Sequence, residues 1–532
     1  MTNTSQRLTA LFPHLRSPAA LSAAATHVPV PHRQAGWTYE STKTVLELLK
    51  DNHQKWHIFF NDRGFHNHAS HHLLAIYALG ANKELLEAAY ATHVAYMKPA
   101  IFPPGGDKVE TIINDSNWKD YVDDEHYYRA YLAYFSAKLT EGPNAIQQVL
   151  EKYVMSADAN IVPGKNGKAP LMLSRFMAGL LHPYIHAGYG VEFEIPGLVA
   201  EALAQTMAHK VEGASLFNEK LFQGDGIADI TAKLATTAIS SSGEKTAPHA
   251  LNILSRIASD PNFAPSALGL PAPIGSGEEL ADIIARVASD KLLVYIEQWS
   301  QDLSANVSAD VLRAKVEEIV WMNATIYGVA GWAGRVQGAD PKKEFNADFL
   351  LMHIVTSALF LPPFMNTLSP KSAALLLRTY FGFSLIVYLL QGRPSFPIAE
   401  FYKATDALPS GPEAPPKFVK DTLPPQKNPN PWNQIVQTTL VHPNEHLCKL
   451  QRALLHFAEQ YGGTAPGAFV SATEGAGSAL TGAEALDGTL FLRVAKLTAD
   501  RLGWMREGQE VGGWDRGGFL RGLDSTVASQ NL

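Results

Sequence analysis

Apolar residues recur at the spacing of an α helix along most of this chain, and this periodicity constrains its fold more than any other feature. Strand-like alternation is scarce, and no regular succession of strands and helices indicates a doubly wound sheet. We therefore expect an all-α fold, with many helices in a single large compact domain. The helical patterns cover residues 73–79, 127–139, 144–153, 170–181, 197–209, 279–302, 309–325, 346–360, 371–390, 444–461 and 487–503.

Segments rich in proline, glycine and serine interrupt these patterns. Residues 406–431 predict a proline-stiffened loop, and residues 240–276 form a second loose stretch. Residues 1–36 contain three arginines and no acidic residue, which predicts a flexible N-terminal segment before the all-α domain over 37–532. An organellar transit sequence has a similar composition and is the alternative for the N-terminal segment.

The overall composition argues against several classes of function. The 532 residues carry a net charge of −7 without blocks of one sign, so nucleic-acid binding is not expected. No stretch of about 18 uncharged apolar residues indicates a membrane span. Cys448 is the only cysteine, so an internal disulfide cannot form and a bound metal would need nitrogen and oxygen ligands. We expect a cytoplasmic protein, and the oligomeric state stays open.

Three segments place two histidines four residues apart. A spacing of four puts both imidazoles on one face of a helix, and in two of the segments a proline suits the first helical turn. Histidine is the commonest metal ligand among side chains, so the pairs suggest a metal-dependent enzyme. Core histidines bonded to backbone carbonyls are the alternative. The pairs are His68 and His72, His182 and His186, and His442 and His446.

Two more residues are expected on inward helix faces near these pairs. His353 stands alone in an apolar helix, where it is either a ligand or a hydrogen-bonded core residue. Lys449 follows His446 by three residues and shares its face. A buried lysine could pair with a carboxylate, extend to water, or be carboxylated and act as an oxygen ligand. Glu192 is a candidate to orient a ligand histidine.

Several familiar cofactor motifs are missing. No G-x-G-x-x-G follows a strand, so the usual flavin and nicotinamide fingerprints are absent, and there is no P-loop, nucleophile elbow or H-E-x-x-H. An imidazole-rich site with nitrogen and oxygen ligands suits iron, copper, manganese or catalytic zinc.

Longer motifs surround the histidines. They read FNDRGFHNH at 60–68, HPYIHAGYGVEF at 182–193 and VHPNEHLCKLQRAL at 441–454, with shorter ones at 71–81, 117–118, 352–357, 392–394, 487–495 and 500–504. Together they resemble the questin oxidase-like family of fungal and bacterial proteins, and the resemblance spans nearly the whole chain after residue 35.

The resemblance implies an oxidoreductase that uses O2 to cleave a ring of an anthraquinone-type or related polycyclic aromatic polyketide. It is compatible with two mechanisms: a non-heme iron dioxygenase with histidine ligands and a modified lysine, or an NADPH-dependent Baeyer–Villiger monooxygenase without flavin. The missing flavin fingerprint and the histidines favour Fe(II). A non-catalytic helical protein that binds a polyketide is an alternative from another class.

The expected site combines these residues. We predict iron ligands at His72, His182, His186 and His353, with Lys449 as a carboxylated ligand and with His68, His446 and Glu192 as alternatives or orienting neighbours. Glu192 and Tyr189 are the expected catalytic side chains. Trp118, Trp432 and Tyr189 are expected to stack on a flat aromatic substrate.

Overall fold

The computed structural model describes residues 2–15, 28–61, 64–100, 111–217, 219–223, 247–270, 280–334, 345–412 and 428–519, together with residues 417, 419 and 423. Within these residues the regular structure is helical, and extended residues pair only in isolated bridges. The prediction of an all-α fold is therefore confirmed. The buried apolar side chains form one continuous core, to which residues from all parts of the chain contribute.

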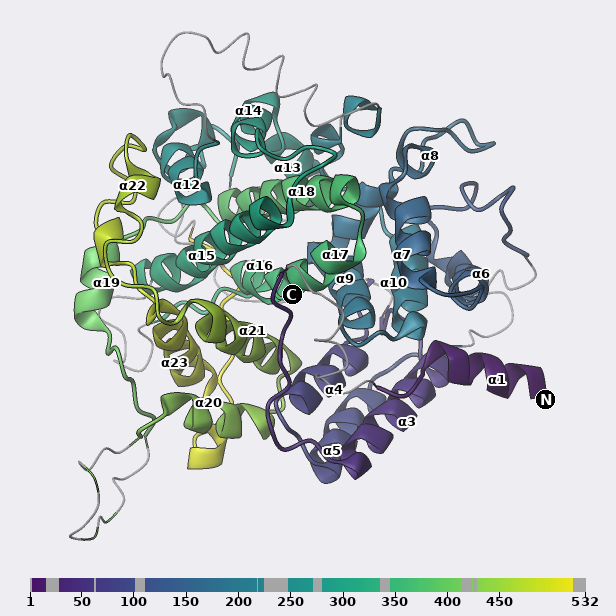
Figure 1. The fold of residues 1–532 in the computed structure, drawn as a ribbon, viewed down its shortest axis with the longest axis horizontal. Coiled ribbons are helices and arrows are strands. Elements are labelled where there is room, and N and C mark those ends of the chain that lie inside the picture. Colours follow the sequence, from purple (N-terminus) through teal and green to yellow (C-terminus); the bar gives the residue numbers. More distant parts are fainter. Residues whose placement is uncertain are drawn as a thin grey trace.

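Helices fill the chain from end to end (Figure 1). The first group contains α1 (Thr2–Leu11), α3 (Tyr39–Lys55), α4 (Ala69–Ala78), α5 (Lys83–Val94), α6 (Tyr128–Lys138), α7 (Ala145–Leu150), α8 (Ala157–Asn160), α9 (Met172–Glu192) and α10 (Pro196–Ala208). The second contains α12 (Ala250–Ser259), α13 (Leu280–Val287), α14 (Asp290–Trp299), α15 (Ala309–Ala333), α16 (Phe349–Ala358), α17 (Leu361–Thr367) and α18 (Pro370–Leu390). The third contains α19 (Ile398–Ala404), α20 (Pro431–Leu440), α21 (Glu445–Tyr461), α22 (Val470–Thr473) and α23 (Leu490–Leu502).

Single turns of 3-10 or π helix join several of these helices. The turns are η1 (Glu125–Tyr127), η2 (Glu151–Met155, a π turn), η3 (Ala214–Leu216), η4 (Glu219–Phe222), η5 (Pro261–Phe263), η7 (Ala483–Ala485) and η8 (Met505–Glu507).

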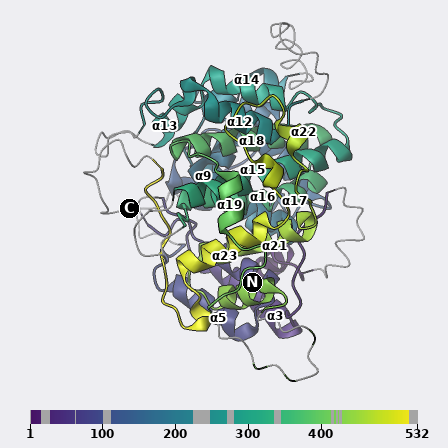
Figure 2. The ribbon, with the colours of Figure 1, turned by 90° about the vertical axis from the view of Figure 1, so that its left-hand side faces the viewer.

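Four helices from distant parts of the sequence meet in the interior. α4 packs against α9 and α21, and α16 packs against the same two helices. Two views place α16 and α21 toward the middle of the molecule (Figure 1, Figure 2). This junction holds the histidines described below.

The prediction that the chain has no long apolar stretch is wrong, because two such stretches occur, and both are interior elements of this fold. Residues 349–367 and 370–390 are apolar and long enough to cross a membrane, but 83% and 100% of their most apolar windows are buried inside the molecule. Such burial is typical of core helices, which are hydrophobic on all sides because other helices surround them.

Three predicted segments differ from the structure. The pattern at 279–302 divides into α13 and α14. The stretch 240–276 is not loose throughout, because α12 buries an apolar face there through Leu251, Leu254 and Ile257. The described part of the N-terminal segment includes α1, which packs against α10. The described residues of 406–430 contain no helix, and the rest of that loop lies outside the described residues.

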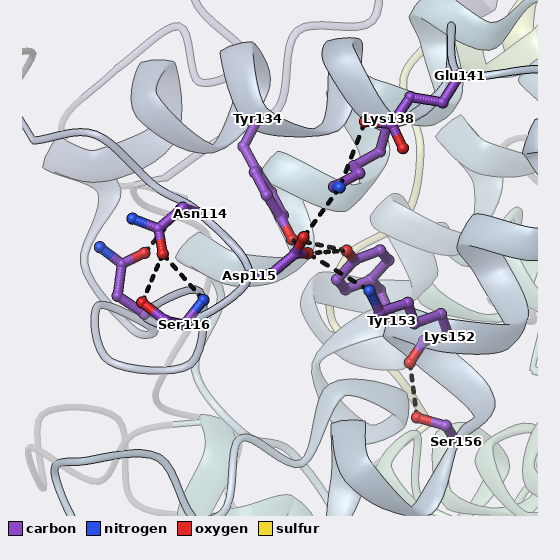
Figure 3. Close-up of polar contacts among 10 residues, drawn as sticks. Asn114, Asp115, Ser116, Tyr134, Lys138, Glu141, Lys152, Tyr153 and Ser156 are labelled. Atoms are coloured by element: carbon purple, nitrogen blue, oxygen red, sulfur yellow. Dashed lines mark hydrogen bonds and ion pairs between the residues drawn. The ribbon is translucent and has the colours of Figure 1, made fainter.

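Polar contacts of Asp115 fix the segment that precedes α6 (Figure 3). The Asp115 carboxylate accepts hydrogen bonds from the hydroxyls of Tyr134 at 2.6 Å and Tyr153 at 3.0 Å. Lys138 and Lys152 lie within 3.1 and 3.4 Å of the same carboxylate. Asp115 thus ties its own loop to both α6 and η2. These hydrogen bonds lower the pKa of its carboxyl group, with Tyr134 as the largest cause.

Candidate metal centre

Four histidines from four helices lie close together in the interior. His68 caps the N-terminus of α4, and His182 follows a break within α9. His353 lies in the second turn of α16, and His446 lies in the first turn of α21. The ligand nitrogens of His68, His182 and His446 all lie within 4.8 Å of one another. The His353 ring centroid is 5.2 Å from that of His182 and 5.3 Å from that of His446. We call these four residues the histidine cluster.

In each histidine of the cluster, Nδ1 faces an oxygen atom. His182 and His353 donate from Nδ1 to the backbone carbonyls of Gly179 and Phe349. The Nδ1 atoms of His446 and His68 lie 3.2 and 4.0 Å from one carboxylate oxygen of Glu445. When Nδ1 carries the proton, Nε2 of a neutral imidazole keeps its lone pair. A hydrogen bond of this kind is the usual arrangement behind a metal-bound histidine.

The free nitrogen atoms of the cluster have the chemistry of a metal site. Among the described residues, no hydrogen-bond partner is found for the buried Nε2 of His353, Nε2 of His446 or Nζ of Lys449, which is costly for a polar atom. Nε2 of His68 and Nε2 of His182 face each other at 2.8 Å. This separation is close to the ~3 Å expected between neighbouring ligands whose bonds to a metal are about 2.1 Å long. The residues therefore fit a divalent transition metal.

Electrostatics keep these imidazoles neutral. Burial, together with neighbouring histidines and Lys449, holds the pKa values of His68, His182 and His353 well below the ordinary value of 6.5. The pKa of His446 is lowered to about 4, with burial again the largest cause. Since only a neutral imidazole can bind a metal ion, the cluster is ready to act as a ligand set at neutral pH.

A left-handed turn aims His182 into the cluster. Gly179, Leu180 and Leu181 have φ of 55°, 56° and 67°, a conformation that costs a non-glycine residue about 1–2 kcal/mol. The turn interrupts α9, and a second helical segment then begins with Pro183 in its first turn, as the sequence predicts. Backbone strain of this kind persists only where the surrounding structure enforces it, and it is concentrated at functional sites.

Two predicted ligands lie outside the cluster, so the predicted set is corrected at His72 and His186. His72 Nδ1 lies 3.0 Å from Nε2 of His93 on α5. His186 is bonded to His71 at 3.0 Å and to the buried carboxylate of Glu201 at 2.7 Å. The reason is the helical rise. Residues four apart share a face but lie about 6 Å apart along the axis, so each meets different neighbours. The cluster contains His68 and His446 in place of His72 and His186.

The third histidine pair is not on a single helix. α21 begins at Glu445 with Asn444 as its N-cap, so His442 precedes the helix. His442 is bonded through Nε2 to the Leu502 carbonyl at 3.0 Å. It is a core histidine satisfied by backbone, which was the alternative for such residues.

Lys449 reaches the cluster from the next turn of α21. The side chain is fully buried, and burial lowers its pKa from 10.5 to about 8. A substantial neutral fraction of the amine therefore exists near pH 8. A neutral amine is the form that can react with CO2 or bind a metal ion, so the placement is compatible with the predicted role.

The predicted catalytic residues Glu192 and Tyr189 occupy a neighbouring region. Glu192 forms an ion pair with Arg452, so it does not orient a cluster histidine. The Tyr189 ring stacks on His71, with 5.2 Å between the centroids, and burial raises the pKa of its hydroxyl. Tyr189 thus contacts His71, a histidine outside the cluster. Glu192 is paired with Arg452 and not with a histidine of the cluster.

The predicted substrate-stacking tryptophans are not brought to the cluster. Trp118 is buried against Tyr153, and its carbonyl accepts a hydrogen bond from Tyr131. Trp432 lies half-buried on α20, and within the described residues no ring contact joins it to a histidine of the cluster. Trp118 is a core aromatic residue, and Trp432 is a partly buried residue packed against the core.

Sequence reasoning missed two carboxylates that contact histidines. Glu201 accepts from His186 and also lies 2.6 Å from Nδ1 of His53, and these contacts outweigh burial and lower its pKa to about 2. The signal was available, since Glu201 is the only acidic residue in the apolar helix α10. Glu445 is the other, and it stands directly beside His446 in the motif at 441–454.

Comparison with known proteins identifies the family of this chain. A family model described as questin oxidase-like matches residues 65–454, a range that includes all four histidines of the cluster. The chain belongs to the questin oxidase-like family. A Baeyer-Villiger oxidase of Pestalotiopsis microspora is 30% identical over 64% of this chain and 69% of its own length. The oxidoreductase AflY of Aspergillus parasiticus is 26% identical over 83% and 78%. The questin oxidase of Aspergillus terreus is 32% identical over 32% and 36%.

These relatives define the class of protein. They are named oxidases or oxidoreductases, and this member of the family is an oxidoreductase. The alternative of a non-catalytic binding protein is therefore set aside.

Proposed function

We propose that this chain is a non-heme iron(II)-dependent oxygenase that cleaves a ring of an anthraquinone-type or related aromatic polyketide with O2. The observation that supports iron most directly is the histidine cluster, in which the ligand nitrogens of His68, His182 and His446 lie within 4.8 Å of one another and His353 lies beside them. The Nδ1 atoms of His182 and His353 donate to backbone carbonyls. The names of the relatives support the substrate class, since one of them is a questin oxidase.

Each part of the site has a role in this proposal. His68, His182, His353 and His446 hold the metal through Nε2, and Lys449 adds an oxygen ligand after its amine has added to CO2 and lost a proton. Bound iron would supply a place where O2 and an electron-rich phenolate exchange electrons, a reaction that spin pairing otherwise makes slow. The surrounding helices exclude water, which strengthens the electrostatic interactions inside.

A second candidate is an NADPH-dependent Baeyer–Villiger monooxygenase that uses no flavin. Its support is the naming of several relatives as Baeyer-Villiger oxidases or monooxygenases. On this alternative NADPH is consumed as an ester forms, and the histidine cluster has a structural role.

Anaerobic metal loading separates the two candidates. The full chain is stripped with a chelator, loaded with Fe(II), and analysed for iron by plasma mass spectrometry. O2 uptake is then followed with a reduced anthraquinone, with and without NADPH. We expect about one iron per chain, and O2 uptake that a chelator abolishes and Fe(II) restores.

Variants identify the ligands. His353→Ala removes an unpartnered nitrogen and should abolish iron retention. His442→Ala is the matched control, because His442 is also buried but bonds only to backbone outside the cluster. A folded chain that binds no iron and oxidises NADPH with ester formation would replace the iron proposal by the second candidate.

A further inference from the structure

Glu445 lies between two histidines of the cluster that come from different helices. Its Oε1 atom is 3.2 Å from Nδ1 of His446 and 4.0 Å from Nδ1 of His68. His446 belongs to α21, and His68 caps α4. The Glu445 side chain is 22% exposed, so one carboxylate links both ligands at the edge of the buried centre.

This contact differs in kind from those behind the other two histidines. His182 and His353 donate to backbone carbonyls, which are neutral acceptors. A carboxylate accepts more strongly, and it makes an imidazole a more basic ligand when it accepts from Nδ1. Only Nε2 then remains to bind a metal. At 3.2 Å from His446, Glu445 favours this tautomer there, and at 4.0 Å from His68 it places a negative charge beside the second ligand.

The charge around the cluster gives this carboxylate a second effect. His68, His182 and His446 lie at or near the starts of helical segments, where backbone N–H groups concentrate partial positive charge. A divalent cation at this point would be repelled unless negative charge lies nearby, and Glu445 supplies it.

We propose that Glu445 is a positioning residue that sets the orientation and tautomer of His446, places negative charge beside His68, and raises the affinity of the centre for a divalent metal. The inference rests on the proposed function, because it assumes that the histidine cluster holds a metal. It extends that function by assigning the residue that couples two ligands to each other.

The test uses Co(II), whose visible spectrum reports ligand number and field. The metal-free full chain is titrated with Co(II) in the presence of a competing chelator, for the unmodified protein and for Glu445→Ala and Glu445→Gln. We expect Glu445→Ala to weaken Co(II) binding about 10–100-fold. Glu445→Gln keeps an acceptor oxygen but loses the charge, so its loss should be smaller, with a shifted spectrum.

Glu459→Gln is the matched control. Glu459 lies on the same helix and 3.9 Å from Nδ1 of His456, which is outside the cluster. It should leave both the affinity and the spectrum unchanged. If Glu445→Ala fails to fold, Glu445→Gln alone decides the question, because it preserves the shape of the side chain.

The outcomes are distinguishable from those that test the proposed function. If the unmodified chain binds neither Co(II) nor Fe(II), the proposed function and this inference are both wrong. If the unmodified chain binds Co(II) but the Glu445 variants bind it with the same affinity and spectrum, only the inference is wrong. Weakened binding by Glu459→Gln to the same degree would also overturn it, because the effect would then be a general one of charge on α21.

Discussion

Replacing Lys449 by methionine should stabilise the metal-free protein while removing a residue of the candidate centre. The Lys449 amine is buried without a hydrogen-bond partner. A buried cation without a partner opposes folding, whereas methionine fills similar space with apolar atoms. The prediction is that stability rises and metal binding falls in the same variant.

The size of the effect follows from the pKa of the lysine. Burial lowers this pKa from 10.5 to about 8, which corresponds to about 3 kcal/mol against folding at pH 7. For 532 residues unfolding together, that free energy is worth a rise of about 3 °C in Tm. The size of this penalty depends on pH. Below pH 8 both states carry the charge and the penalty is complete. Between about pH 8 and 10.5 the folded state is neutral first, so the penalty disappears as pH rises.

The assay is thermal unfolding of metal-free protein in CO2-depleted buffer at pH 7 and pH 9.5. Lys449→Met should melt about 3 °C above the unmodified chain at pH 7, and the difference should shrink at pH 9.5. Lys315→Met is the matched control, since Lys315 is equally buried but lies 3.3 Å from Glu318 and 3.4 Å from Asp302. Removing this cation leaves the partly buried Glu318 carboxylate without its charge partner, so this variant should lose stability.

A lower Tm for Lys449→Met at pH 7 would refute the reasoning. It would mean that the lysine has a stabilising partner in the folded protein. An equal gain for both lysine variants would also refute it, because the effect would then come from the apolar side chain and not from the missing partner.

Three further predictions test the surroundings of the cluster. His68→Ala should lose bound metal in plasma mass spectrometry, whereas His72→Ala should retain it, and equal retention would contradict the assignment. Burial raises the pKa of Glu212 from 4.5 to about 7, so the stability of the unmodified chain should fall as pH rises through this range. Glu212→Gln should therefore be more stable by up to about 3 kcal/mol at pH 8 and gain almost nothing near pH 4.5, as measured by urea unfolding. Gly179→Ala places a Cβ 2.5 Å from a neighbouring imidazole at φ +55°, and should lower Tm more than Gly64→Ala, which has φ +73° and nothing within 4 Å. Equal losses would show that only backbone conformation matters.

Local patterns in the sequence determined much of this protein. Helical periodicity predicts the all-α fold, because an apolar stripe at that spacing can be buried only as a helix. The proline of the motif at 182–193 marks the start of a helical segment within α9. The residues around His353 and Lys449 are apolar enough to place both side chains in the interior, as the structure confirms.

Only the tertiary structure decided which histidines meet. The sequence favoured His72 and His186, but a spacing of four specifies a shared face and not a shared neighbour. The meeting of α4, α9, α16 and α21 brings His68, His182, His353 and His446 to one place. His72 and His186 lie one turn further along, beside His93 and Glu201. The reason is that a metal site needs its ligand atoms within a few ångströms of one point, and the packing of separate helices sets those distances.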